Sequence, residues 1–127
     1  MSERPSDAEQ LRAWCLEMPG AVETFPFNPE TSAFRIGSGG KIFALSALGR
    51  ARLKVSIKAD PEIVAGTQRS YEAAGPGYHL NKRHWMTITL GGDLPGALLR
   101  DLIEDSYDLV RPRPTGGRPD PSNAIEP

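Results

Sequence analysis

The sequence predicts a single α+β domain, a two-layer sandwich in which two helices cover one face of a four-stranded antiparallel sheet. Three observations predict this fold. Apolar residues recur at helical spacing near both ends of the chain, short segments between them alternate apolar and polar residues, and brief turns rich in Gly or Pro join these segments. Short connections favour antiparallel strands, whose apolar face needs helices to cover it. The expected order of elements is α-β-β-β-α-β-α.

The first helix is expected over residues 7–18. Ser6 and Glu9 fit a capping box, in which each side chain bonds the backbone N–H group of the other residue. An apolar stripe follows at helical spacing, formed by Leu11, Trp14, Cys15 and Met18. A Pro-Gly pair ends the helix, and the proline-containing residues 21–32 are read as a loop.

Three strands with short connections follow, over residues 34–36, 41–46 and 51–58. The third strand alternates most clearly. Its apolar side chains are Leu53, Val55 and Ile57, and its polar ones are Arg52, Lys54, Ser56 and Lys58. This alternation predicts that one face of the sheet packs on the core and that the other faces solvent.

A short second helix is expected over residues 61–72, because Asp60 suits the N-cap and Pro61 the first helical position. Its expected core anchors are Ile63, Val64 and Tyr71. A fourth strand is expected over residues 86–90, with inward side chains from Met86, Ile88 and Leu90.

The last helix is expected over residues 95–110, where an apolar stripe again recurs at helical spacing. Residues 1–111 are therefore expected to form one domain. Residues 112–127 contain five prolines and almost no apolar anchors, which predicts a disordered tail rich in Pro and Gly.

The net charge of −1 conceals a segregation of charge along the chain. Residues 1–32 carry a net charge of −4, residues 33–90 one of +6 and residues 91–127 one of −3, which can create a local field. No apolar run approaches the length of a membrane span, no signal peptide opens the chain, and a single cysteine excludes an internal disulfide. These features favour a cytoplasmic protein, and we also expect a monomer.

The outward face of the sheet is the first candidate site. If the alternation holds, it carries cations and hydroxyl groups from several strands, namely Arg35, Arg52, Lys54, Ser56, Lys58, Thr87 and Thr89. Such groups suit the phosphate oxygens of DNA, which accept hydrogen bonds and need neutralising charge. An ordinary solvated sheet face explains the same residues equally well.

The second candidate site is the segment of residues 78–85. It gathers polar and aromatic side chains of Tyr78, His79, Asn81, Lys82, Arg83, His84 and Trp85. Lysine and arginine grip phosphate, Asn81 can read an adenine edge, and Trp85 or Tyr78 can stack on a base. For Trp85 we favour a structural role as a core anchor, whereas for the basic residues functional and solvated roles weigh equally.

No pattern for a metal, a cofactor or catalysis stands out. His79 and His84 are five positions apart in an irregular segment, and Cys15 lies on a core stripe. No recognised spacing of a nucleophile and its base occurs. We therefore expect no metal site, no cofactor and no enzymatic activity.

Three stretches of the chain carry a resemblance to a known family. They are residues 18–23 with Pro26-Phe27, residues 40–44 with residues 55–58 and Asp60-Pro61, and, most specifically, His79-Leu80-Asn81-Lys82 with His84-Trp85. Over about residues 7–110 the chain resembles the MmcQ/YjbR family of small bacterial proteins. The resemblance implies a CyaY/frataxin-like sandwich and a DNA-binding role, and it points to Lys58, Asn81, Lys82 and His84. It does not imply the iron binding of frataxin, because the first helix is not densely acidic.

The leading hypothesis is a non-enzymatic DNA-binding protein with phosphate contacts from the sheet face and from residues 78–85. The modest basic excess predicts weak, salt-sensitive binding. A second hypothesis is a small-molecule or anion-binding module whose pocket is built from Tyr78, His79, Asn81, Lys82 and Trp85. A third is a protein-interaction domain that uses the C-terminal tail.

Overall fold

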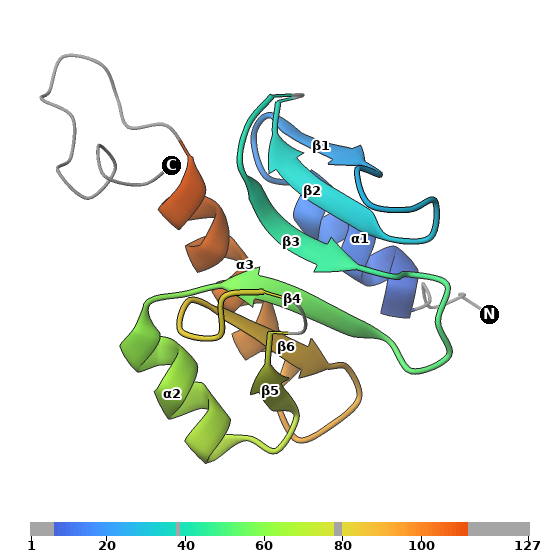
Figure 1. The fold of residues 1–127 in the computed structure, drawn as a ribbon. Coiled ribbons are helices and arrows are strands. Elements are labelled where there is room, and N and C mark those ends of the chain that lie inside the picture. The colour runs from blue at the N-terminus through green and yellow to red at the C-terminus, as the bar shows by residue number, and fades with distance from the viewer. Residues whose placement is uncertain (1–6, 38, 78–79, 112–127) are drawn as a thin grey trace, which may run out of the picture.

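The sheet is larger than the sequence predicts. The computed structural model describes residues 7–37, 39–77 and 80–111, which form three helices and one six-stranded antiparallel sheet with the strand order β1-β2-β3-β4-β6-β5 (Figure 1). The elements are α1 (Asp7–Leu16), β1 (Ala21–Thr24), β2 (Ser32–Ile36), β3 (Ile42–Ser46), β4 (Lys54–Lys58), α2 (Pro61–Ser70), β5 (Ala74–Pro76), β6 (Trp85–Thr89) and α3 (Gly96–Val110). The α+β class is as predicted. The proposed capping residue Ser6 and the tail of residues 112–127 lie outside the described residues.

The two additional strands are short and lie at the edges of the sheet. β1 occupies the segment read as a loop and pairs with β2, after a turn in which Gly20 adopts a φ of +76°, a conformation that favours glycine. β5 contains Pro76 and pairs with β6 at the opposite edge, where a missing N–H group costs no ladder bond. The prediction of four strands is wrong because such short runs alternate too little to be distinguished from loops.

Two helices cover one face of this sheet, as expected. α1 contacts β1 and α3, and α3 in turn contacts β3 and β4 (Figure 1). The inward side chains of β4 are Val55 and Ile57, both fully buried, and β6 contributes the buried Met86 and Ile88. The alternation read from the sequence therefore gives the correct inward face for both central strands.

α2 lies at the β5 edge of the sheet. Val64 is buried there as predicted, and Gln68 Nε2 donates to the carbonyl oxygen of Gly75 at 3.0 Å. Ile63 was expected to be a core anchor, but it is 47% exposed. That expectation is wrong because α2 touches the sheet along a narrow stripe, and the residue next to Val64 turns away from it.

A β-bulge lies where β2 pairs with β3, next to the β3–β4 junction that joins the two halves of the sheet, β1–β3 and β4–β6. The register of β2 with β3 shifts between Phe34 and Arg35. This leaves an extra residue on β3, and the consecutive Phe43 and Ala44 are both fully buried. The Phe43 ring meets Tyr107 of α3 edge-on, with ring centroids 5.4 Å apart. The bulge therefore gives α3 a large aromatic side chain to pack on at the middle of the sheet.

Ser106 of α3 bonds to both strands of the β3–β4 junction. In the described part of the chain, β3 and β4 are in register at only two residue pairs. Just beyond them, the fully buried Ser106 hydroxyl donates to the carbonyl oxygen of Phe43 at 2.7 Å and accepts from the backbone N–H group of Lys58 at 2.9 Å. The Ser106 side chain therefore lies where a third pair of ladder residues would otherwise bond directly.

A carboxylate holds the β6–α3 loop against the turn between α2 and β5. Asp93 accepts hydrogen bonds from the backbone N–H groups of Ala73 at 2.8 Å and Glu72 at 2.9 Å. These two bonds lower the pKa of Asp93 from its ordinary value of 3.8, since they favour the charged form. The Asp93 carboxylate therefore fixes the loop that leads into α3.

Candidate functional site

The outer face of the sheet carries no negative charge at the strand positions that the structure describes. Glu23 is the only acid in the six strands, and its carboxylate is turned toward the helices. It accepts from Arg12 Nε of α1 at 2.7 Å and from Ser32 Oγ at 2.5 Å. The outward positions of the described strands therefore carry cations and neutral side chains but no carboxylate.

The helix side of the molecule is acidic instead. α3 alone exposes four carboxylates, those of Asp101, Glu104, Asp105 and Asp108. Desolvation raises the pKa of Asp105, and the nearby charges of Asp108 and then Asp101 raise it further. Negative and positive charge thus lie on opposite sides of the domain, a separation that the net charge of −1 hides.

β4 and β6 form a ladder of outward side chains, as the alternation predicts. Its three cross-strand pairs are Lys54 with Thr89, Ser56 with Thr87, and Lys58 with Trp85. The hydroxyl groups of Ser56 and Thr87 hydrogen-bond to each other at 2.8 Å. Lys54 is exposed and Lys58 is half-buried, and at about 3.3 Å per residue their Cα atoms stand about 13 Å apart.

The two other predicted cations of this face differ in their availability to a ligand. Arg52 lies immediately before β4 and is exposed. Arg35 on β2 instead donates from Nε to Thr24 Oγ1 at 3.2 Å and from Nη1 to the carbonyl oxygen of Gly40 at 3.4 Å. These bonds occupy part of the Arg35 guanidinium, so the geometry favours Arg52 over Arg35 as a phosphate ligand.

Residues 80–84 form a turn that is tied to the end of β4. The carbonyl oxygen of Asn81 accepts from the backbone N–H group of Trp85 at 2.9 Å, and that of His84 accepts from the N–H group directly after β4 at 2.8 Å. The side-chain oxygen of Asn81 accepts from the backbone N–H group of Arg83 at 2.9 Å. Asn81 therefore shapes the turn, and this engagement does not favour the predicted contact with an adenine edge.

The basic side chains of this turn lie at its surface. Lys82 and Arg83 are exposed, and His84 is half-buried. Lys82 Nζ donates to the carbonyl oxygen of Gly77 at 3.3 Å, a long bond that an exposed lysine can exchange for a phosphate. His79 lies outside the described residues. The turn and Lys58 therefore share one end of the sheet, while Arg52 and Lys54 lie at the other end of β4.

Trp85 lies on the outer face of the sheet and not in the core. It precedes the buried Met86 and stands opposite Lys58. The backbone at Gly77 lies directly against Trp85. A Cβ atom added to Gly77 would lie only 2.8 Å from the Trp85 Cβ atom. The predicted role of Trp85 as a core anchor is therefore wrong. Tyr78, the other aromatic residue of the segment, lies outside the described residues.

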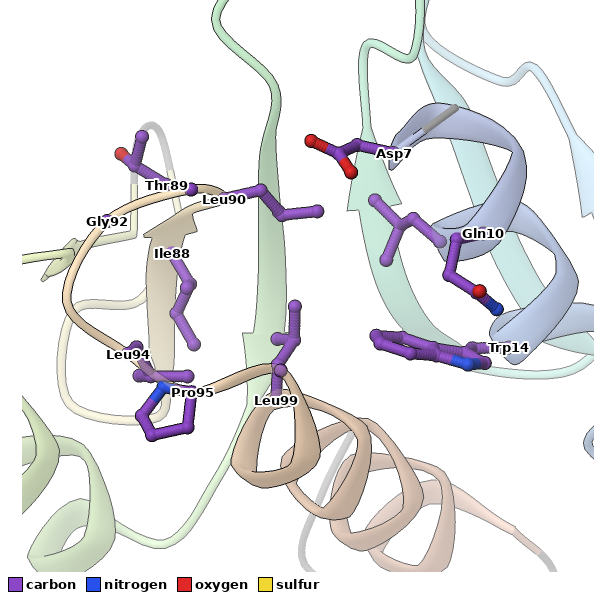
Figure 2. Close-up of a pocket in the computed structure, with 13 residues that line it drawn as sticks. Asp7, Gln10, Trp14, Ile88, Thr89, Leu90, Gly92, Leu94, Pro95 and Leu99 are labelled. Atoms are coloured by element: carbon purple, nitrogen blue, oxygen red, sulfur yellow. The ribbon is translucent and has the colours of Figure 1, made fainter. Parts of the chain in front are cut away.

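A cleft that the sequence analysis did not anticipate lies at the far end of β6. It separates the start of α1 from the β6–α3 loop and the start of α3, and its volume is about 370 Å³ (Figure 2). A second hollow beside it shares Asp7 and the residues from Thr89 to Gly92 and is also lined by Arg52. Neither is lined by residues of the 80–84 turn, so these hollows do not form the predicted small-molecule pocket.

The cysteine and the acidic residues form no reactive centre in the described structure. Burial raises the pKa of Cys15 to about 12, and the negative charge of Glu23 adds to the effect. No three His, Cys, Asp or Glu side chains among the described residues come together in a group that could hold a metal ion. None of the described helices is both long and apolar enough to span a bilayer.

A family model described as YjbR matches residues 16–109, most of the chain. The chain belongs to the YjbR family. A relative in Escherichia coli O157:H7, the uncharacterized protein YbdF, is 42% identical over 102 residues, which cover 80% of this chain and 82% of the relative. The uncharacterized protein YjbR of Escherichia coli K12 is 31% identical over 98 residues, or 77% of this chain and 81% of the relative.

Solved structures share this YjbR fold. A Deinococcus radiodurans protein with a DUF419 domain superposes with a TM-score of 0.74 at 42% identity, covering 78% of this chain and 74% of that one. A Pseudomonas syringae protein superposes with a TM-score of 0.69 at 28% identity, covering 80% and 97%. The sequence resemblance to the MmcQ/YjbR family is therefore confirmed.

Proposed function

We propose that this YjbR-family protein is a non-enzymatic DNA-binding protein that holds the phosphate backbone against the outer face of β4 and β6. The observation that carries the proposal is the one-sided distribution of charge. The outward strand positions described here bear lysines, an arginine and hydroxyl groups without a carboxylate, whereas the acids of α3 lie on the opposite side. A polyanion would therefore meet attraction on one side of the domain and repulsion on the other.

The spacing of the cations supports a contact along the backbone. Lys54 and Lys58 stand about 13 Å apart along β4, about the axial rise of four base pairs. The hydroxyl groups of Ser56 and Thr87 lie between them and can donate to a phosphate oxygen, as side-chain hydroxyl groups often do. Arg52 extends the row at one end, and the exposed Lys82 and Arg83 extend it at the other.

The same features set the expected strength of binding. A site of about five cations neutralises few phosphates, and each contact adds about 0.9 to the slope of log affinity against log salt concentration. We therefore propose weak binding that is detectable at low salt and lost at moderate salt. We also propose that the protein is a cytoplasmic monomer; a monomer suffices for this binding because one face of one chain supplies the whole row of contacts.

A small-molecule site at residues 78–85 has less support. The side chains of Asn81 and Lys82 bond within their own turn, and the indole of Trp85 lies on the sheet face. A protein-interaction role through the tail of residues 112–127 concerns a segment outside the described residues. DNA binding is therefore the function that the described geometry favours.

The test is the affinity for duplex DNA across a salt titration, with the double variant Lys54→Ala/Lys58→Ala. Losing two phosphate contacts should weaken binding about tenfold at low salt and reduce the slope of log affinity against log salt by about 2. The matched control is Arg100→Ala/Arg111→Ala, which removes the same charge from exposed positions at α3. Absence of binding by the wild type at low salt, or equal effects of the two double variants, would refute the proposal.

A further inference from the structure

We infer that the cleft between α1 and the start of α3 binds a small organic cation with an aromatic or alkyl body. The cleft adjoins the hollow that Arg52 lines, but its own lining includes none of the cations of the outer sheet face, and the inference does not rest on DNA binding. Its volume of about 370 Å³ falls within the range of small-molecule sites.

The cleft has an apolar floor and one aromatic wall. Figure 2 shows Trp14 reaching from α1 toward Leu99 of α3, with Leu94 and Pro95 on the facing side. Leu94 and Leu99 are buried from solvent, so they form a fixed apolar surface at its base. Such a lining favours the flat ring or alkyl chain of a ligand over a fully hydrated ion.

The negative charge of the lining favours a positively charged ligand. Asp7 is the one ionisable residue among the described residues that line the cleft, and Gln10 adds an amide on the same wall (Figure 2). No ion pair joins the Asp7 carboxylate to another residue of the described structure. A carboxylate at the mouth of an apolar cleft attracts an ammonium group and disfavours a carboxylate or phosphate.

Trp14 adds a second attraction for a cation. Indole rings bind cations through the negative charge at the faces of the ring. The Arg100 guanidinium carbon already lies 5.9 Å from the centroid of the Trp14 ring, which shows that this ring can accept a cation. Arg100 is not among the cleft-lining residues, so a ligand in the cleft would meet Trp14 and Asp7 without meeting that positive charge.

The experiment is an NMR titration of the full chain with phenethylamine and, separately, with phenylacetate, which carries the same ring and the opposite charge. Phenethylamine should produce saturable shifts of the Trp14 indole N–H and of the backbone amides of Gly91, Gly92 and Gly96, all of which line the cleft. A Trp85→Phe variant assigns the two indole signals. Phenylacetate should bind at least about threefold more weakly, the ratio that one partly exposed ion pair supports.

Two variants test the geometry. Asp7→Asn should weaken phenethylamine about threefold to fivefold, whereas Asp101→Asn, the same change at an exposed position of α3 outside the cleft, should leave the affinity unchanged. Gly96→Leu should abolish binding, because a Cβ at Gly96 lies 3.9 Å from Trp14 Cη2 and a longer side chain would enter the cleft.

Three outcomes would overturn the inference: no saturable shift, shifts that map outside the cleft, or equal affinity for the amine and the acid. Equal effects of Asp7→Asn and Asp101→Asn would overturn it as well. The two proposals fail separately, because Lys54→Ala/Lys58→Ala should retain the amine affinity and Asp7→Asn should retain DNA binding.

Discussion

Replacing Ser106 with alanine should destabilise the domain more than its small size suggests. The Ser106 hydroxyl makes two hydrogen bonds in a fully buried position, at 2.7 Å to the Phe43 carbonyl oxygen and at 2.9 Å from the Lys58 N–H group. Alanine can neither donate nor accept, so the variant removes both bonds from the joint between β3 and β4. A buried backbone group that loses its partner costs about 1–3 kcal/mol.

The structure sets the expected magnitude. Two such groups lose this partner together, and relaxation of the joint recovers part of the loss, so we expect the free energy of unfolding to fall by about 2–4 kcal/mol. For a domain of this length, about 3 kcal/mol corresponds to a decrease in Tm of about 10 °C. The assay is urea denaturation followed by circular dichroism, with the midpoint and the slope fitted separately.

The control is Ser70→Ala, at an exposed position at the end of α2. It should change the free energy of unfolding by less than about 0.5 kcal/mol. If Ser106→Ala also changed the free energy of unfolding by less than about 0.5 kcal/mol, the two bonds would not stabilise the β3–β4 junction. The role assigned to Ser106 would then be wrong.

Three further predictions concern ionisable side chains. Burial, with a smaller effect of nearby negative charge, raises the pKa of Cys15 to about 12, so native protein at pH 8 should react with a thiol reagent only when it unfolds, and rapid labelling would contradict this. The lowered pKa of Asp93 contributes stability that is present above its unfolded pKa and lost as the pH falls through the folded value, so the destabilisation by Asp93→Ala in urea should shrink in acid. A constant difference down to strongly acidic pH would refute it. The raised pKa of Asp105 means that its charged form opposes folding, so Asp105→Asn should raise Tm at pH 7 and should leave Tm unchanged once the carboxyl group is protonated in acid. A Tm at pH 7 no higher than that of the wild type would contradict it.

The central strands were predictable because the polarity of each side chain indicates which face of the sheet it occupies. On β4 the buried Val55 and Ile57 alternate with Lys54 and Lys58, and that period of two reveals both the strand and its outward surface. β1 and β5 have only four and three residues, and their pairing depends on neighbours distant in the sequence. Local pattern alone does not identify such strands, so the sheet was predicted with two strands too few.

The candidate site was predictable only in part for a related reason. Charge and alternation locate the row of cations on β4, but hydrogen bonds decide which of them can meet a ligand, as the partners of Arg35 and Asn81 show. The cleft was missed because Trp14 recurs on the same stripe as Leu11, and spacing does not separate a buried residue from one that only borders the core. Trp85 was misassigned because an aromatic residue at the start of a strand fits either face.

The Ser106 bridge also constrains the order in which the chain can fold during synthesis. α3 is the last element of the described domain, yet it holds β3 against β4, and Tyr107 beside Ser106 donates from its hydroxyl group to the carbonyl oxygen of Pro19 at 2.5 Å. Hairpins such as β1–β2 need only local contacts and can form early, whereas these long-range bonds come last. The direct pairing of β3 with β4 therefore gains the Ser106 and Tyr107 bonds only after α3 has left the ribosome, so the buried support of this pairing is the last part of the domain to form.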